Sequence, residues 1–430
     1  AGAPPPRVIP GDVDALPWLM DVPVAVDVTG QHVYGPLDVD DLGIDTRRVP
    51  AGGCVNYIVD VESAAEAIDR HALAAVHGRS VLLSPDVWLW RPSTWPRSDD
   101  DRARLEVVDD GDGLSLALPF AAHREGGVVV TASTWRLQSW GLVGRLQRHA
   151  ITRAGTTLTV HRAAHGDGRL ADATLDRWLE VAVDDVASSG AFPVAAINVV
   201  VVDDGDDDAR PIRVGFLGRG GGAGMVLHVG AAPKNDDDDD DDDTGRWVLT
   251  HELSHLLLPP IDQRDGWLNE GAATWMQEVL PAQAGRRDVV VAAGNLQRGL
   301  QTGAARALDD GFTLERSCAE MHARRSYQHC YWGGAALLTL LARDVGDDGV
   351  IALLRALPGP VDGPPQRATA VLQAARTSSD PRVARAATTL LALWTQSAQA
   401  PFPTAALSSS SNSGDIGGFA WPASDDGVDR

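Results

Sequence analysis

One segment of this chain reads Trp247-Val-Leu-Thr-His-Glu-Leu-Ser-His-Leu-Leu-Leu258 and contains an HExxH motif. Its histidines, His251 and His255, are spaced so that on a helix they lie on one face, about one turn apart. Two imidazoles in this arrangement can bind one zinc ion through ring nitrogens. Glu252 follows the first histidine and is suited to act as a general base on water at the metal. The apolar flanks predict a buried helix, which the Pro-Pro pair after Leu258 ends.

HExxH also arises by chance, so the next segment decides how much weight it carries. The second histidine is followed by Glu270, within the run Gly266-Trp-Leu-Asn-Glu-Gly-Ala-Ala-Thr-Trp-Met-Gln-Glu278. This run predicts a second helix that begins near Asp265, a good N-cap residue, and buries its tryptophans. Two histidines and one glutamate, with water in the fourth position, are the ligand set of catalytic zinc proteases. We therefore expect one Zn²⁺ ion per chain, bound by His251, His255 and Glu270.

HELSH followed by WLNEG resembles the gluzincin peptidases, in particular the aminopeptidase N family and the related glycyl aminopeptidases. The spacer before the glutamate is longer in aminopeptidase N, so the resemblance is to the superfamily. A second match is Tyr331-Trp-Gly-Gly-Ala-Ala-Leu-Leu338, which is similar to the stretch whose tyrosine stabilises the tetrahedral intermediate in those enzymes. The resemblance is specific over about residues 247–340. It implies that Tyr331 donates a hydrogen bond to the oxyanion, with Tyr327 and His329 as nearby competitors for that role.

The resemblance implies an α+β protein in which a β-rich N-terminal domain precedes a thermolysin-like catalytic domain and a helical C-terminal part. It also implies hydrolysis of peptide bonds in peptide or protein substrates, with Glu252 passing a proton from water to the leaving nitrogen. Aminopeptidases of this family hold the substrate's amino group with a glutamate. The corresponding region here, near Gly218–Gly224, has no acid. Aminopeptidase and endopeptidase action therefore both stay open.

Two further alternatives remain. The chain could be a catalytically inactive, zinc-stabilised binding or scaffold protein derived from such a peptidase, or a hydrolase of a non-peptide substrate. The presence of Glu252 and of all three ligands favours catalysis. Thermolysin-like enzymes orient a zinc histidine with an aspartate four residues after the ligand glutamate. Thr274 stands at that position here, so the sequence does not name the partners of the histidines.

A glycine-rich run precedes an expected strand at Met225–Val229. It lacks the Gly-Lys-Ser/Thr ending of a phosphate-binding loop. The resembled peptidases place the edge strand of the substrate cleft at about this point. Gly221, Gly222 and Gly224 would let the substrate backbone approach that edge, and a flexible surface turn is the alternative.

Composition limits the possible partners. The net charge of −22 argues against nucleic acid or an anionic membrane surface. No run of roughly 18 or more apolar residues predicts a membrane span. The chain begins with Ala-Gly-Ala-Pro-Pro-Pro, which is typical of an exported protein whose signal peptide has been removed. We therefore expect a periplasmic or secreted protein.

Cysteines and aspartates leave two questions open. Cys318 and Cys330 flank a short segment before the tyrosine stretch and could pair in an oxidising compartment, with Cys54 left over. They could equally be free thiols. The run Asp236–Asp243 predicts a solvated loop, for which calcium binding is an alternative.

The expected domains are a β-rich domain over 1–165, a catalytic domain over 166–345, a helical part over 346–400 and a tail over 401–430. Strands are expected at Val24–Val28, Cys54–Val61, Ser80–Leu83, Leu114–Leu118, Val128–Ala132, Thr156–His161, Ala195–Val202 and Met225–Val229. Further helices are expected at Ala64–Val76, Ala171–Ser188, Asp288–Leu308, Leu314–Arg325, Gly334–Arg343, Val350–Ala356, Pro365–Arg376 and Asp380–Thr395.

Overall fold

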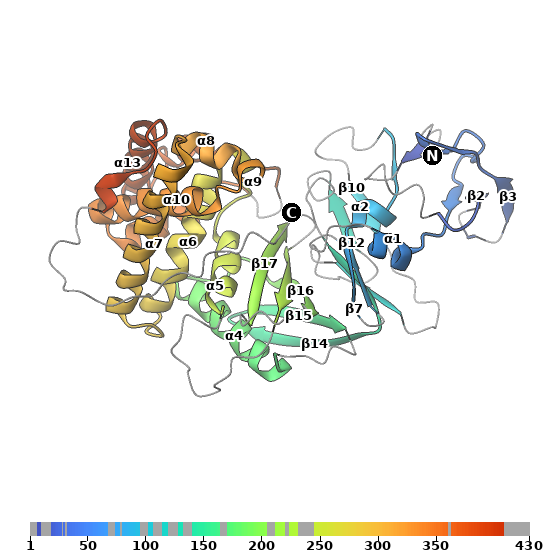
Figure 1. Ribbon diagram of the computed structural model, residues 1–430, viewed down its shortest axis with the longest axis horizontal. Helices are drawn as coiled ribbons and strands as arrows, with labels where there is room; N and C mark the ends of the chain where they lie inside the picture. Colours follow the sequence, from blue (N-terminus) through green and yellow to red (C-terminus); the bar gives the residue numbers. More distant parts are fainter. Residues whose placement is uncertain are drawn as a thin grey trace.

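In the computed structural model, a β-rich N-terminal part leads into a mixed sheet, and a large body of helices covers that sheet (Figure 1). The structure describes residues 7–9, 19–27, 29–30, 32–67, 74–77, 80–94, 102–105, 114–118, 128–131, 140–163, 170–203, 211–219, 223–230, 245–359 and 363–407. The aspartate run at Asp236–Asp243, Gly221 and Gly222 lie outside these residues, as does most of the expected tail.

The N-terminal part consists mainly of short antiparallel strands. They are β1 (Arg7–Ile9), β2 (Val24–Val26), β3 (Val33–Pro36), β4 (Val39–Asp40), β5 (Gly43–Asp45), β6 (Cys54–Asn56), β7 (Ala74–His77), β8 (Ser80–Leu83), β9 (Arg91–Pro92), β10 (Arg102–Leu105), β11 (Ser115–Ala117), β12 (Val128–Thr131) and β13 (Gly141–Gly144). The described strands pair in the orders β4-β5-β1-β9, β3-β2-β6, β11-β13-β8-β7 and β10-β12. Two short helices, α1 (Val61–Ala67) and α2 (Pro85–Trp88), lie between them.

Two predicted elements of this part are wrong. The strand expected at Cys54–Val61 ends at Asn56, and Val61 instead begins α1. Of the helix expected at Ala64–Val76, Ala64–Ala67 lie in α1, whereas Ala74–Val76 belong to β7, which pairs antiparallel with β8. An alanine-rich run is compatible with either structure, so the neighbouring strand decides it.

The helices pack against a further sheet, which has five strands. Its strands are β14 (Leu146–Arg153), β15 (Thr156–Ala163), β16 (Ala196–Asp203), β17 (Ile212–Arg219) and β18 (Ala223–Val229), in the order β14-β15-β16-β18-β17. β15, β16 and β18 are parallel, and antiparallel strands border them on both sides. The sheet therefore begins at β14, before the domain boundary expected after residue 165.

The expected edge strand is wrong. Met225–Val229 belongs to β18, which pairs with β16 on one side and β17 on the other and is buried at every residue. The edge is β17, the antiparallel strand that precedes the glycine run. Leu82 and Trp140 of the N-terminal part pack against Val200 and Val226 of this five-stranded sheet. The N-terminal part and the five-stranded sheet therefore share a core.

The helices are α4 (Asp172–Ser188), α5 (Trp247–Ser254), α6 (Gly266–Gln283), α7 (Val289–Asp310), α8 (Leu314–Ala319), α9 (Met321–Arg324), α10 (Tyr327–Val345), α11 (Asp347–Ala356), α12 (Ala368–Ala375) and α13 (Pro381–Ser397), with 3₁₀ turns η3 (His255–Leu257), η4 (Gln263–Asp265) and η5 (Thr404–Ala406). Among these described helices, none combines the length and the apolar character needed to cross a membrane.

Several helix limits differ from the prediction. The helix expected at Leu314–Arg325 breaks at Glu320 into α8 and α9, and α10 begins at Tyr327, before the expected Gly334. Asp265 does precede α6, but its side chain makes no bond to that helix. Its carboxylate instead accepts hydrogen bonds from the Arg367 side chain at 3.0 Å and from the backbone N–H of Ala368, at the start of α12, at 2.8 Å.

One hydrophobic core runs from Ile151 to Ala406 and includes residues of the helical part expected at 346–400. Residues 401–407 are not a loose tail, because Phe402 is buried in this core and η5 follows it. The helical C-terminal part and the helices α5 and α6 therefore share one interior.

α6 and α10 cross at two glycines. A Cβ atom on Gly271 would lie 2.5 Å from Gly334 Cα, and one on Gly334 would lie 2.0 Å from the carbonyl oxygen of Trp267. Only residues without side chains allow so close a contact. The crossing brings the helix that carries Glu270 against the helix that carries Tyr331.

Candidate metal centre

The two motif histidines lie at the end of α5, where the helix tightens into η3. Both are buried, with 4% of His251 and 7% of His255 exposed. Their Nε2 atoms point to the same carboxylate oxygen: Glu270 Oε2 lies 3.3 Å from His251 Nε2 and 3.5 Å from His255 Nε2. The structure therefore brings the three expected ligands together from α5, η3 and α6.

These distances suit a tetrahedral zinc ion. Ligand atoms roughly 2.0–2.1 Å from a tetrahedral centre stand about 3.3–3.4 Å from one another. Glu252 also lies beside the histidines, since its carboxylate and their ring nitrogens lie within 4.8 Å of one another. Glu270 Oε2 is the oxygen that faces both Nε2 atoms, and the Glu252 carboxylate lies within reach of the same histidines. The donor set fits zinc.

The charges around Glu270 keep it ionised. Burial alone would raise the pKa of its carboxyl, but His255, His251 and a hydrogen bond from Tyr331 lower it to about 2. Burial also lowers the pKa of His255 to about 4, so this imidazole is neutral near pH 7. A neutral His255 and an ionised Glu270 are the forms in which these two side chains bind a metal. The pKa of His251 is instead raised: burial opposes the shift, but the hydrogen bond to Glu270 and the charges of Glu252 and Glu270 outweigh it.

Gln277 is a site residue that the sequence did not identify. His251 Nδ1 lies 2.8 Å from Gln277 Oε1, and the amide side chain is buried. This contact places the imidazole N–H on Nδ1 and turns Nε2 toward Glu270. Gln277 follows Glu270 by two turns of α6, so helical spacing was the available signal. Thr274, at the position of the thermolysin-like aspartate, has a buried hydroxyl without a partner among the described residues.

Tyr331 stands beside these ligands in the second turn of α10. Its ring stacks on His251, with centroids 5.8 Å apart and planes at 21°. Its hydroxyl makes the hydrogen bond that lowers the pKa of Glu270. The neighbouring Cys330 forms a disulfide with Cys318, which ties α10 to α8. Of the two states left open for these cysteines, the structure has the bridged one.

The two competitors of Tyr331 are occupied elsewhere. The Tyr327 hydroxyl lies 3.1 Å from His322 Nδ1. His329 is fully buried, with its ring nitrogens 3.1 Å from an Asp310 oxygen and 2.6 Å from the Pro401 carbonyl. His329 therefore anchors the segment after α13 rather than facing the metal ligands.

The glycines expected to line the cleft are placed differently. Gly224 lies inside the sheet, paired with Asn198 and Gly218. The glycine that touches the site is Gly215 on the edge strand β17, where a Cβ atom would lie 2.7 Å from Glu252 Cγ. The edge strand therefore runs directly against the side chain expected to act as the base.

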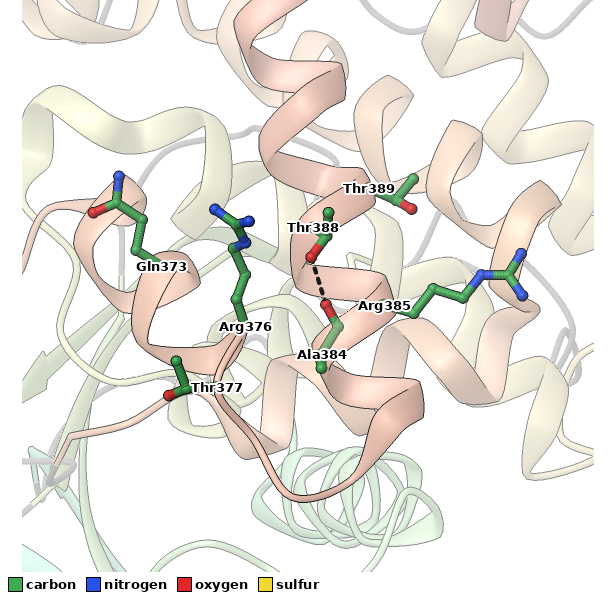
Figure 2. A pocket seen from close by; sticks show the side chains of 7 residues that line it. All are labelled: Gln373, Arg376, Thr377, Ala384, Arg385, Thr388 and Thr389. Atoms are coloured by element: carbon green, nitrogen blue, oxygen red, sulfur yellow. Dashed lines mark hydrogen bonds between the residues drawn. The ribbon is translucent and has the colours of Figure 1, made fainter.

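A surface hollow lies away from this centre, between α12 and α13 (Figure 2). Its volume is about 510 Å³. It is lined by Gln373, Arg376, Thr377, Ala384, Arg385, Thr388 and Thr389. Arg385 is held by Asp344 at 2.6 Å, and the Thr388 hydroxyl bonds the Ala384 carbonyl of its own helix. The hollow shares no residue with the metal centre.

Comparisons with known proteins bear on the fold. No family model matches the sequence, and no curated protein matches it. An aminopeptidase N family protein from Idiomarina loihiensis has a similar structure, with a TM-score of 0.57 and 13% identity over 87% of this chain and 68% of that one. An M1 zinc metallopeptidase from Deinococcus radiodurans is similar with a TM-score of 0.41 and 18% identity, over 74% of this chain and 70% of that one. The likeness to the aminopeptidase N family protein confirms the α+β class, and this chain shares the fold of that protein.

Proposed function

We propose that this chain is a zinc metallopeptidase that hydrolyses peptide bonds. The observation that carries the proposal is the position of Glu270 Oε2, 3.3 Å and 3.5 Å from the Nε2 atoms of His251 and His255. These three residues would hold the ion, with Glu252 beside them. The fold of the aminopeptidase N family supports the same conclusion.

Zinc, when bound, supplies a Lewis acid that polarises the substrate carbonyl and makes water more acidic. Glu252 then accepts a proton from the attacking water and delivers it to the leaving nitrogen. The Tyr331 hydroxyl, next to Glu270, donates a hydrogen bond to the oxygen that gains negative charge. Gln277 keeps His251 in one orientation through its ring N–H.

The edge strand supplies a place for the substrate backbone. In the described part of the chain, β17 pairs with β18 only and is the last strand on its side of the sheet, which is where a further strand can add. An extended peptide can add to such an edge by main-chain hydrogen bonds. Since Gly215 of β17 contacts Glu252, a peptide on this edge lies close to the proposed base.

The test combines metal analysis with turnover. The purified chain should bind about one zinc ion per molecule, and a chelator should abolish cleavage of a peptide library. Glu252→Gln should keep the zinc and lower turnover by about a hundredfold or more, because the shape stays and the base is lost. Zinc binding without cleavage of any peptide would instead identify an inactive zinc-stabilised protein. Libraries with free and blocked amino termini separate aminopeptidase from endopeptidase action.

We also propose that the protein works in an oxidising compartment. The Cys318–Cys330 disulfide supports this proposal, because such bonds are rare in reducing cytosol. Mass spectrometry of the protein isolated under non-reducing conditions should find the two cysteines joined. Free thiols at both positions would contradict the proposal.

A further inference from the structure

A buried arginine ties the edge strand to the end of the metal-binding helix. Arg219 is the last residue of β17, and only 9% of it is exposed. One guanidinium nitrogen donates to the Leu258 carbonyl at 2.7 Å, and another donates to the carbonyl of His255 itself. Arg219 therefore bonds the main chain of a proposed metal ligand from an element far from it in sequence.

The helix end needs these donors. α5 ends at Ser254, and η3 carries the chain only to Leu257. The His255 carbonyl accepts one bond from the Leu258 N–H at 3.2 Å, but two prolines follow Leu258 and cannot donate a backbone N–H to the remaining carbonyls of the helix end. A cation is also favoured at this end, where the helix dipole is negative. Burial lowers the pKa of Arg219 to about 10, which still leaves it protonated near pH 7.

The same strand touches the site at a second point. Gly215 of β17 faces α5 about one helical turn before His255. A side chain at position 215 would collide with Glu252 and Val248. β17 thus runs along α5 from the proposed base to the second histidine. Two contacts on one strand fix its distance from the helix, which a single contact would not do.

We propose that Arg219 is a positioning residue of the metal centre, which fixes His255 by its carbonyl and holds the substrate edge of β17 against it. An arginine suits the role because its planar fork can reach two carbonyls in one fixed geometry, whereas a lysine ammonium is a single flexible point of charge. The inference rests on the proposed function, since it takes His255 as a metal ligand.

The test compares Arg219→Met with Arg162→Met. Arg162 is a matched control, because it is also a buried arginine at 6% exposure in the same sheet, and it bonds the Leu170 carbonyl and Asp203 away from the histidines. Zinc dissociation constants are measured by competition with a chromogenic chelator, next to thermal unfolding. We expect Arg219→Met to raise the zinc dissociation constant about tenfold or more, as loss of a ligand-orienting contact does. Arg162→Met should lower the unfolding temperature and leave zinc affinity unchanged.

Arg219→Lys gives the second readout, with an expected zinc affinity between those of the wild type and Arg219→Met. If Arg219→Met fails to fold, the zinc affinity of Arg219→Lys alone tests the positioning role of Arg219. Wild-type zinc affinity in Arg219→Lys and Arg219→Met, or an equal loss in Arg162→Met, would overturn the proposal. The readout does not depend on turnover. A wild-type chain that binds zinc but cleaves no peptide refutes the proposed function and still tests the role of Arg219.

Discussion

Replacing Tyr331 by phenylalanine removes one hydroxyl and keeps the ring that stacks on His251, with centroids 5.8 Å apart. The side chain is partly exposed, so its hydroxyl does not leave a deeply buried gap. The hydrogen bond that it makes to Glu270 is lost. A net hydrogen bond contributes about 1 kcal/mol to folding, so the free energy of unfolding should fall by no more than that. The ring packing should be preserved.

Two roles for the hydroxyl predict different measurements. A donor to an oxyanion acts only near the transition state, so its loss should lower kcat by about 10²–10³, roughly 2.7–4 kcal/mol, with KM little changed. A group that serves only to hold Glu270 in place should instead weaken zinc binding by about 10–100-fold. We expect the first result, since Glu270 is already placed by Asn269, whose side-chain N–H donates to its Oε1 at 3.0 Å.

The assay is steady-state cleavage of one peptide together with a zinc competition titration. Tyr327→Phe is the matched control, because that tyrosine lies one turn earlier on α10 and bonds His322. Its kcat should match the wild type. A large kcat loss in Tyr327→Phe and none in Tyr331→Phe would show that the donor is misassigned by one turn. Wild-type kcat in both variants would leave the oxyanion to the metal alone.

Three further variants test the surroundings of the site. Gln277→Leu removes the acceptor of His251 Nδ1–H and should raise the zinc dissociation constant about 10–100-fold, and an unchanged constant would refute the role. Changing Cys318 and Cys330 to alanine should lower the free energy of unfolding in urea by about 2–4 kcal/mol, because the crosslink spans a sequence separation of 12, and equal unfolding midpoints would contradict this. Burial raises the pKa of the folded Asp185 carboxyl, so its contribution to stability is present below its ordinary pKa and is lost as pH rises through the raised one. Asp185→Asn should therefore flatten the loss of stability as pH rises above about 4, the ordinary pKa of the carboxyl, whereas an unaltered slope would count against the burial argument.

The parts of the site that could be predicted depend on spacing within a helix. His251 and His255 share a face because the helix repeats every 3.6 residues, and Glu270 belongs to the next helix along the chain. Gln277 has the same kind of spacing relative to Glu270. Which histidine it bonds depends on how α5 and α6 cross, and no local pattern contains that information. The role of Arg219 was missed for the same reason, since its partners lie on another element.

The order of strands in the sheet could not be predicted. The strand at Ile212–Arg219 and the strand at Ala223–Val229 both contain several apolar residues and lie close together in the sequence. Either could have been the edge, and the pairing of β18 with β16 decides it. The same limit explains β7, whose alanine-rich sequence takes its structure from β8. The α+β class was predicted correctly because it depends on the succession of strands and helices along the chain.

The glycine crossing of α6 and α10 has a mechanical consequence. Gly271 and Gly334 form the point where the two backbones meet, so any rocking of one helix on the other pivots there. Displacement in such a motion grows with distance from the pivot. Glu270 is the residue next to Gly271, and Tyr331 lies less than one turn from Gly334. These two side chains lie close to the pivot and are therefore displaced little by such a motion. The far ends of α6 and α10 can move while the separation between the Glu270 carboxylate and the Tyr331 hydroxyl stays nearly constant.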